Sequence, residues 1–91
     1  MTLSIVIVSY NARADLERCL ASLTVHPPAI PHDIVVVDNA SSDDSVAAVR
    51  RGWPGVTVIT QPLNRGFAHA NNVGIRVTSG ALVLLLNSDT I

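Results

Sequence analysis

The sequence is poor in cysteine, in charged residues and in aromatic residues, and these shortages exclude several classes of protein. Its 91 residues include one cysteine, Cys19, so the chain can form neither an internal disulfide nor a zinc site built from cysteines. Charged residues make up 14% and the formal net charge is −1, which argues against binding to nucleic acid. Hydrophobic residues still make up 48%, so we expect one small globular domain over residues 1–91.

Long hydrophobic runs and a basic leader are also missing. The longest fully apolar run, residues 81–86, is far shorter than the roughly 20 residues that span a bilayer. Met1 is followed by Thr2, Leu3 and Ser4 without a basic segment, which argues against a secretory signal. We therefore expect a cytoplasmic protein, which in a longer form would work at the inner face of the membrane.

What the sequence does contain is an alternation of strand-like and helical segments. Runs rich in Val, Ile and Leu predict strands at 4–8, 33–37, 56–59 and 81–86. All but the run at 56–59 are nearly continuous, which is typical of parallel strands covered on both faces, whereas 56–59 alternates and indicates an edge strand. The resulting order, βαβαβαβ, predicts an α/β fold: a Rossmann-like parallel sheet with helices on both faces.

Three segments between these strands have apolar residues at helical spacing. The residues expected to face the sheet are, in chain order, Leu16, Cys19, Leu20 and Leu23; Val46, Val49 and Trp53; and Phe67, Ala70, Gly74 and Val77. Asn11 is expected to cap the first helix, and Ser42 or Asp43 the second. Residues 24–32, which are rich in proline, are expected to form a loop.

Polar residues follow every predicted strand. They are Ser9, Tyr10 and Asn11 after the first; Asp38, Asn39 and residues 40–44 after the second; residues 61–66 with Arg65 after the third; and Asn87, Ser88 and Asp89 after the fourth. Parallel α/β sheets bind ligands at the carboxyl ends of their strands, so we expect these residues to form one site.

The residue types at this site narrow the ligand. Neither G-x-G-x-x-G nor the P-loop pattern follows the first strand, which disfavours dinucleotide-binding and P-loop proteins. Carboxylates suit ribose hydroxyls, base N–H groups and hard metal ions, but they repel phosphate. If Asp89 faces a diphosphate, a Mg²⁺ or Mn²⁺ ion must lie between the two, with Arg65 supplying further positive charge.

Four segments resemble, in this order, the landmarks of family 2 glycosyltransferases, which have the GT-A fold. They are SIVIVSYN at 4–11, VVVDNASSDDS at 35–45, NRGFAHANNVG at 64–74 and LLLNSDT at 84–90. The branch that they resemble contains the bacterial rhamnosyltransferases and other enzymes of cell-surface polysaccharide synthesis. The resemblance covers essentially the whole chain and implies that it is a subdomain that binds a nucleotide-sugar donor.

The resemblance also implies roles for residues at matching positions. Ser9, Tyr10 and Asn11 would line the nucleotide pocket together with Asn39, and Asp38 would accept a hydrogen bond from the N3–H of uracil or thymine. Arg65 would lie near the base or the phosphates. Asn87, Ser88 and Asp89 would replace the D-x-D motif, with Asp89 as the metal ligand and Asn87 near the ribose or the metal. The donor would then be a UDP- or dTDP-sugar.

In this family the acceptor site and the general base come later in the chain than the D-x-D motif. We therefore expect no catalytic residue among residues 1–91, a chain that does not transfer sugar alone, and a glycan or lipid-linked acceptor bound by a longer protein. We also expect the apolar last strand to pair two copies into a homodimer. Two alternatives stay open: a non-catalytic nucleotide-binding or regulatory module, and a nucleotidyltransferase-like enzyme.

Overall fold

The computed structural model describes residues 2–78 and 80–87, and the chain alternates strands and helices throughout that part. In chain order the elements are β1 (Leu3–Ser9), α1 (Arg13–Val25), β2 (His32–Asp38), α2 (Ser45–Gly52), β3 (Thr57–Thr60), α3 (Phe67–Arg76) and β4 (Leu82–Asn87). The predicted order, βαβαβαβ, is confirmed. The proline-rich loop is shorter than expected, because Thr24 donates its hydroxyl to the Leu20 carbonyl (2.9 Å) and α1 continues to Val25.

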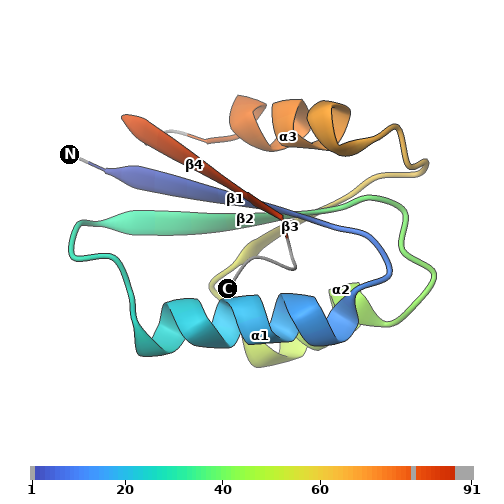
Figure 1. Cartoon of the computed structure of the whole chain (residues 1–91), viewed down its shortest axis with the longest axis horizontal. Coiled ribbons are helices and arrows are strands. Elements are labelled where there is room, and N and C mark those ends of the chain that lie inside the picture. The colour runs from blue at the N-terminus through green and yellow to red at the C-terminus, as the bar shows by residue number, and fades with distance from the viewer. Residues whose placement is uncertain (1, 79, 88–91) are drawn as a thin grey trace.

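The four strands form one parallel sheet in the order β3-β2-β1-β4. In the centre Ile5 of β1 pairs in register with Ile34 of β2 and with Leu84 of β4. Helices α1 and α2 cover one face of the sheet, and α3 covers the other (Figure 1). The arrangement confirms helices on both faces and an edge position for β3.

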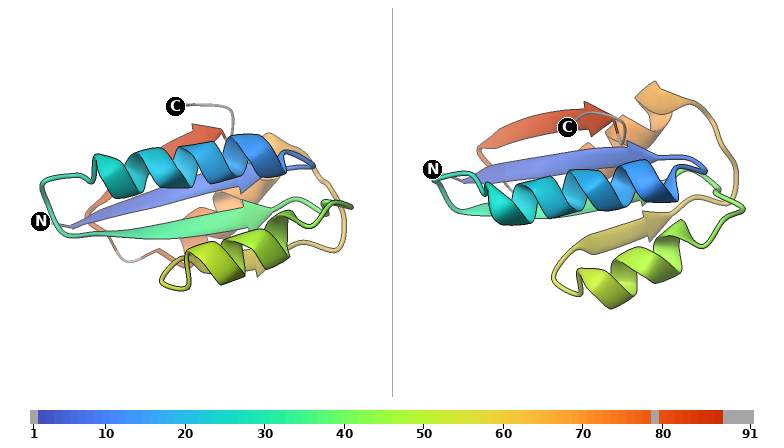
Figure 2. Two further views of the ribbon diagram at one scale, coloured as in Figure 1. Left: turned by 90° about the horizontal axis from the view of Figure 1, so that it is seen from below. Right: turned by 60° about the horizontal axis from the view of Figure 1, so that its bottom comes forward.

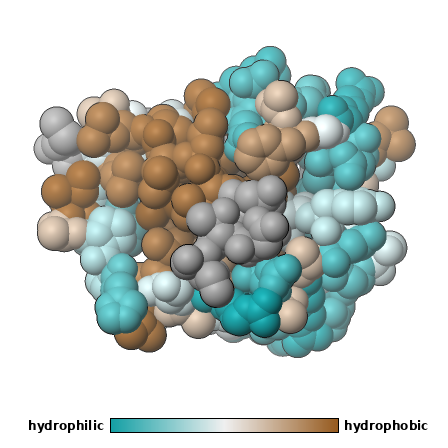
Figure 3. All heavy atoms as spheres, viewed as in Figure 1, coloured by the Kyte–Doolittle hydropathy of each residue, from teal (hydrophilic) through white to brown (hydrophobic). Residues whose placement is uncertain are grey.

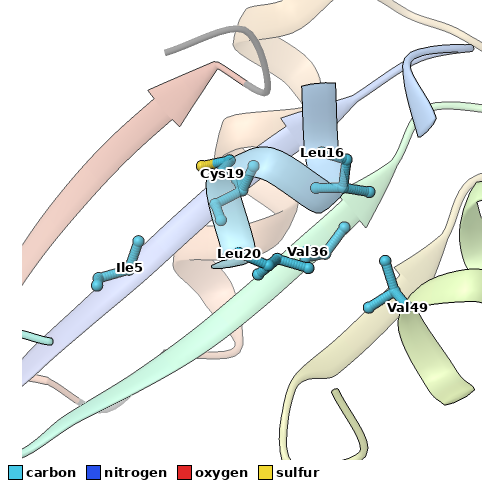
Figure 4. Close-up of a cluster of buried hydrophobic side chains, with 7 residues drawn as sticks. Ile5, Leu16, Cys19, Leu20, Val36 and Val49 are labelled. Carbon is cyan, nitrogen blue, oxygen red and sulfur yellow. The ribbon is translucent and has the colours of Figure 1, made fainter. Parts of the chain in front are cut away.

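The first core lies between the sheet and the pair of helices α1 and α2, which run side by side (Figure 2). Its buried members are Ile5, Ile7, Leu16, Cys19, Leu20, Val36 and Val49, six of which are labelled in Figure 4. The predicted stripe of α1 is therefore confirmed, with Leu23 partly buried against the core. Of the predicted α2 stripe only Val49 is a buried core residue, Trp53 packs against the core, and Val46 is not part of it. Burial among apolar side chains raises the pKa of the Cys19 thiol, since desolvation disfavours the thiolate.

The second core lies under α3 and depends on Gly74. Ala70 packs there against Val6, Val8, Val35 and Val37. A Cβ atom on Gly74 would stand 2.4 Å from Val6 Cγ1 and 3.1 Å from Val37 Cγ2, so only glycine lets the helix approach this closely.

The predicted inner face of α3 is half wrong. Phe67 is 47% exposed and Val77 is 54% exposed, whereas the polar Asn71 is buried. Because α3 is held to the sheet at Ala70 and Gly74, the residues at its two ends extend past the cover that the sheet provides. Asn71 lies between them in the same stripe and is enclosed.

β4 carries apolar side chains that little else covers. Leu82, Val83, Leu84 and Leu85 are each 40–48% exposed, and we call this set the β4 margin. Figure 3 shows hydrophobic side chains gathered on this side of the molecule, where β4 lies in the same view of Figure 1. Within the described residues β4 pairs with β1 alone, so its other edge has no strand beside it. No helix in that part of the chain has both the length and the apolar character needed to span a bilayer.

Candidate functional site

The loops after the first three strands meet at the carboxyl edge of the sheet, as predicted. Ser9 and Asp38 are register partners at the ends of β1 and β2, and Asp38 pairs in turn with Thr60 of β3. Beyond the strands, the Asn39 N–H donates to the Ser9 carbonyl (2.8 Å) and the Gln61 N–H to the Asp38 carbonyl (2.9 Å). These loops lie together at the right of Figure 1.

The fourth predicted segment is described only at its first residue. Asn87 ends β4 and pairs with Val8 of β1, which places its backbone beside the carboxyl end of the central strand. Ser88 and Asp89, the predicted donor-site and metal-binding residues, lie outside the described residues. Their roles stay predictions from the sequence.

Buried polar atoms without partners mark this edge. Within the described part of the chain these are Ser9 Oγ, Asp38 Oδ1, Asn39 Oδ1 and Asn71 Oδ1. Leaving a buried polar group unpaired costs roughly 1–3 kcal/mol, so such groups normally have a ligand or an ordered water as partner. Three of these four residues were predicted site residues, and Asn71 was not.

The four atoms form two pairs on opposite faces of the sheet. Ser9 and Asp38 continue the alternation that places Ile7 and Val36 in the core beneath α1 and α2. Asn39 continues the opposite alternation, and it lies on the face covered by α3, where Asn71 is also buried. The carboxyl edge therefore presents an acid and a hydroxyl on one face and two amide oxygens on the other.

Asp38 has one oxygen fixed by the protein and one free. The N–H of Ser41 donates to Oδ2 (3.1 Å), whereas Oδ1 has no partner among the described residues. The side chain is almost fully buried, at 4% exposure. A carboxylate held this way can accept one further hydrogen bond from an N–H or O–H group of a ligand.

Asn11 does not cap α1, so that prediction is wrong. The N-cap of α1 is Ala12, and no side chain caps it within the described chain. The Asn11 carbonyl oxygen instead accepts from the N–H of Ser42 (2.7 Å) and the N–H of Asp43 (3.4 Å), in the loop after β2. Asn11 adopts φ +48°, a conformation that asparagine tolerates better than most residues.

Asp43 organises the start of α2, as the sequence indicated, although Asp44 is the N-cap residue. One Asp43 oxygen accepts from both the backbone N–H and the hydroxyl of Ser45, and the other from the Arg13 N–H (3.3 Å). The hydrogen bond from the Ser45 hydroxyl, together with its backbone N–H and with Arg13, lowers the pKa of the Asp43 carboxyl. Arg13 also pairs with Asp44, which ties α1 to α2.

Asn39 holds the loop that precedes α3. Its amide donates to Asn64 Oδ1 (2.8 Å) and to the Gly66 carbonyl (3.4 Å), and the Gly66 N–H also donates to Asn64 Oδ1 (2.9 Å). Gly66 has φ +94°, which favours glycine at this turn. Asn64 lies in the loop at 61–66 that was predicted to join the site, although only Arg65 was singled out there; its place two residues before a glycine in a polar loop was the available signal.

Tyr10 and Arg65 flank the site from the two loops and remain exposed. Tyr10 is 51% exposed, and Arg65 makes no ion pair with any described residue. Both side chains are therefore available to a ligand, Tyr10 for stacking or hydrogen bonding and Arg65 for phosphate.

The described residues contain no group of three or more His, Cys, Asp or Glu side chains that could hold a metal ion. A metal bound mainly by phosphate oxygens needs only one or two protein carboxylates, so the residue types of the sequence still fit Mg²⁺ or Mn²⁺.

A hollow lies at the opposite, amino edge of the sheet. It is lined by Thr2, Leu3, Pro31, His32, Asp33 and Gly80. Two of its lining residues are bonded by the buried hydroxyl of Ser4, which donates to Asp33 (2.7 Å) and accepts from the Gly80 N–H (3.0 Å). The described residues thus leave unpaired buried polar atoms at the carboxyl edge and not in this hollow.

Comparison with known proteins identifies the family. The model of glycosyl transferase family 2 matches residues 4–91. The chain belongs to this family. An uncharacterized glycosyltransferase of Haemophilus influenzae is 36% identical over 87 residues, which cover 96% of this chain and 29% of the relative. The succinoglycan biosynthesis protein ExoU of Rhizobium meliloti is 33% identical over 88 residues, which cover 93% of this chain and 25% of the relative.

Solved structures of glycosyltransferases share the fold. The mannosyltransferase PcManGT from Pyrobaculum calidifontis, in complex with GDP-Man and Mn²⁺, superimposes with a TM-score of 0.87 at 30% identity, over 96% of this chain and 27% of that one. Residues 1–349 of S. aureus TarS, in complex with UDP, give a TM-score of 0.86 at 27% identity, over 98% of this chain and 28% of that one. These matches confirm the predicted GT-A fold.

The chain spans less than a third of the length of these relatives. Membership of family 2 favours a sugar transferase over the nucleotidyltransferase alternative, whereas the non-catalytic binding module stays open. The branch of the family is not defined by these relatives, which are of several kinds.

Proposed function

We propose that this chain is the donor-binding part of a glycosyltransferase that transfers a sugar from a UDP- or dTDP-sugar to an acceptor hydroxyl. The observation that carries the proposal is the set of buried, unpartnered polar atoms at the carboxyl edge. In a family 2 chain this edge is where a nucleotide would supply the missing partners.

The pair formed by Ser9 and Asp38 supports a pyrimidine base. Uracil and thymine present one N–H between two carbonyl oxygens. Asp38 Oδ1 can accept that N–H, and the neighbouring Ser9 hydroxyl can donate to a carbonyl oxygen. Guanine presents its N1–H between one carbonyl oxygen and an amino group, so a Ser9 donor would find an acceptor on only one side of that N–H, whereas uracil and thymine offer a carbonyl oxygen on both sides.

We assign the remaining predicted residues as follows. Tyr10, Asn11 and Asn39 border the base and ribose, Arg65 lies toward the diphosphate, and Asn87 and Ser88 contact the ribose or the metal. Asp89 would hold Mg²⁺ or Mn²⁺ together with phosphate oxygens, and the bound ion would stabilise charge on the departing diphosphate. Mn²⁺ in the mannosyltransferase complex supports a divalent ion in this family.

The wider setting is also proposed. The relative named for succinoglycan biosynthesis supports a role in cell-surface polysaccharide synthesis, with a glycan or lipid-linked acceptor. Within that setting we propose a rhamnosyltransferase-like activity for a longer protein containing this chain, at the inner face of the membrane. Residues 1–91 would bind donor nucleotide without transferring sugar alone.

We further propose that two copies of the chain associate through the β4 margin. Its apolar side chains and unpaired backbone edge are the same on each copy, so two-fold pairing would satisfy both at once.

Calorimetric titration of the chain with UDP, dTDP and GDP, each with and without Mn²⁺, tests the donor site. We expect UDP or dTDP to bind more tightly than GDP, and Mn²⁺ to strengthen binding in the native chain but not in Asp89→Ala. Mn²⁺ added without nucleotide is the control. No binding of any nucleotide in either condition would refute the proposal.

A further inference from the structure

Asn11 connects the loops that follow β1 and β2, and it does so through both its backbone and its side chain. Its N–H donates to the Ser41 hydroxyl (2.8 Å). Its side-chain oxygen accepts from the Ser42 N–H (2.7 Å), the Ser42 hydroxyl (3.2 Å) and the Asp43 N–H (3.4 Å). One residue of the first loop thus holds three consecutive residues of the second.

Ser41, which the Asn11 backbone N–H holds and which directly precedes the residues bonded by the Asn11 side chain, is the residue that orients Asp38. The Ser41 N–H occupies Asp38 Oδ2, so the free oxygen of the carboxylate is Oδ1. If the loop at 41–43 moved away, Oδ2 would lose its hydrogen bond from Ser41, and the orientation of the Asp38 carboxylate would no longer be fixed. The direction in which Asp38 accepts a hydrogen bond therefore depends on the position of Ser41.

The backbone of this turn is adapted to the same task. Asn11 has φ +48° and Ala40 has φ +65°, so each loop contains one residue in the left-handed region beside the point where the loops join. Such conformations persist only where surrounding interactions hold them. The hydrogen bonds of Asn11 provide those interactions.

We propose that Asn11 is a positioning residue of the donor site: its side-chain oxygen fixes the loop at Ser42 and Asp43, and this loop holds Ser41 where it aims Asp38 Oδ1 at the base. The role rests on the proposed function, since it presumes that Asp38 receives a nucleotide. It differs from a direct contact between Asn11 and ligand, because the group that matters is the Asn11 side-chain oxygen, which is already used within the protein.

Three substitutions at Asn11 separate the two roles. Asn11→Gly suits the positive φ but removes the oxygen, Asn11→Ala removes the oxygen and disfavours the φ, and Asn11→Asp keeps an acceptor oxygen while losing the amide N–H₂. Ser42→Ala is the matched control, since it removes a hydroxyl from the same cluster but leaves all three backbone donors in place.

Two measurements are made on each variant. The first is amide hydrogen exchange at Ser41 and Ser42 in the nucleotide-free chain, with the amides of Leu16 and Leu20 in α1 showing that the variant is folded. The second is affinity for UDP or dTDP. We expect Asn11→Gly and Asn11→Ala to speed exchange and weaken binding by roughly fivefold or more, Asn11→Asp to keep exchange close to that of the native chain, and Ser42→Ala to stay close to the native chain in both measurements.

The outcomes are distinguishable. Unchanged exchange at Ser41 in Asn11→Gly, or weaker binding by that variant while its loop stays protected, would overturn the positioning role and favour direct contact. A native chain that binds no nucleotide would refute the proposed function, and with it the donor site to which Asn11 is assigned.

Discussion

The carboxyl edge and the β4 margin differ in the kind of group that each leaves without a partner. At the carboxyl edge the unsatisfied groups are polar and buried, with Asp38 4% exposed, whereas at the β4 margin they are apolar and 40–48% exposed. A buried polar atom requires a directional partner, which a small polar ligand can supply. An exposed apolar strand requires area, which only another protein surface can supply.

α3 explains why the two regions differ. It packs on β1 and β2 at Ala70 and Gly74 and leaves β4 uncovered, while its first turn closes the carboxyl edge beside Asn39. One helix therefore completes the centre of the sheet and stops short of its margin.

The largest expected effect comes from moving α3 away from the sheet, which would expose the apolar centre of the sheet as the β4 margin is exposed. In Gly74→Val the added atoms would meet Val6 and Val37, so we expect the free energy of unfolding to fall by about 2–3 kcal/mol. For a domain of this size that lowers Tm by roughly 10–20 °C. Gly52→Val, where no neighbour lies within 4 Å, should leave Tm nearly unchanged. Equal Tm values for the two variants would contradict the packing described for α3.

The next effect concerns the carboxyl edge. Asp38→Asn keeps an acceptor for the Ser41 N–H but removes the buried charge, and an amide oxygen is a weaker hydrogen-bond acceptor than a carboxylate oxygen. We expect nucleotide affinity to fall about tenfold or more, with thermal stability unchanged or raised, because an unpaired buried charge is costly. Asp33→Asn, at the other end of β2, is the matched control and should bind nucleotide normally. Loss of stability without loss of binding would make Asp38 a structural residue.

A smaller effect is expected at the β4 margin. Leu84→Lys places a charge on the exposed edge strand, and we expect it to weaken self-association by roughly tenfold while the monomer stays folded. Val25→Lys, at an exposed apolar position at the end of α1, is the control and should not change association. Sedimentation over a range of concentrations measures both. A native chain that stays monomeric at every concentration would remove the dimer proposal.

The smallest effect is the contribution of Asp43 to stability at low pH. Since the pKa of Asp43 is lower in the folded chain, its contribution is present above about pH 4 and is lost as pH falls through the folded pKa. Asp43→Asn should therefore give a shallower loss of stability between pH 4 and pH 2.5 in urea titrations. The effect is small because Asp43 is exposed. An unchanged pH dependence would show that the Ser45 hydrogen bonds do not matter to folding.

Much of the fold was predictable because it depends on local patterns. Continuous runs of β-branched residues indicated the buried strands β1 and β2, and the stripe from Leu16 to Leu23 indicated the face of α1. The continuous run at 81–86 predicted a covered strand as well, and that was wrong, because β4 lies at the edge of the described sheet with the apolar side chains of the β4 margin 40–48% exposed. Convergence of the strand exits followed from parallel topology alone, which is why the sequence could predict that Ser9, Asp38 and Asn39 lie together at the carboxyl edge.

The errors arose where a side chain is used across the fold. Asn11 has the sequence position of a helix cap, yet its side-chain oxygen accepts a hydrogen bond from Ser42, which lies 31 residues further along the chain. No local sequence pattern encodes such a contact. The hydrogen bond from the Asn39 amide to the Asn64 side chain likewise joins residues that are 25 positions apart in the sequence. Phe67 and Val77 fit an apolar stripe, but they lie at the two ends of α3, where the sheet does not cover them.

The most direct test of the donor site is to map nucleotide binding on the chain by NMR. We predict that UDP or dTDP shifts the amide signals of Tyr10, Asn39 and Ser41 at the carboxyl edge, and that paramagnetic Mn²⁺ broadens signals at this edge when nucleotide is present. Leu3 and Asp33, which line the hollow at the amino edge, should be unaffected. Shifts confined to the amino edge, or no shifts at saturating nucleotide, would contradict a donor site at the carboxyl ends of these strands.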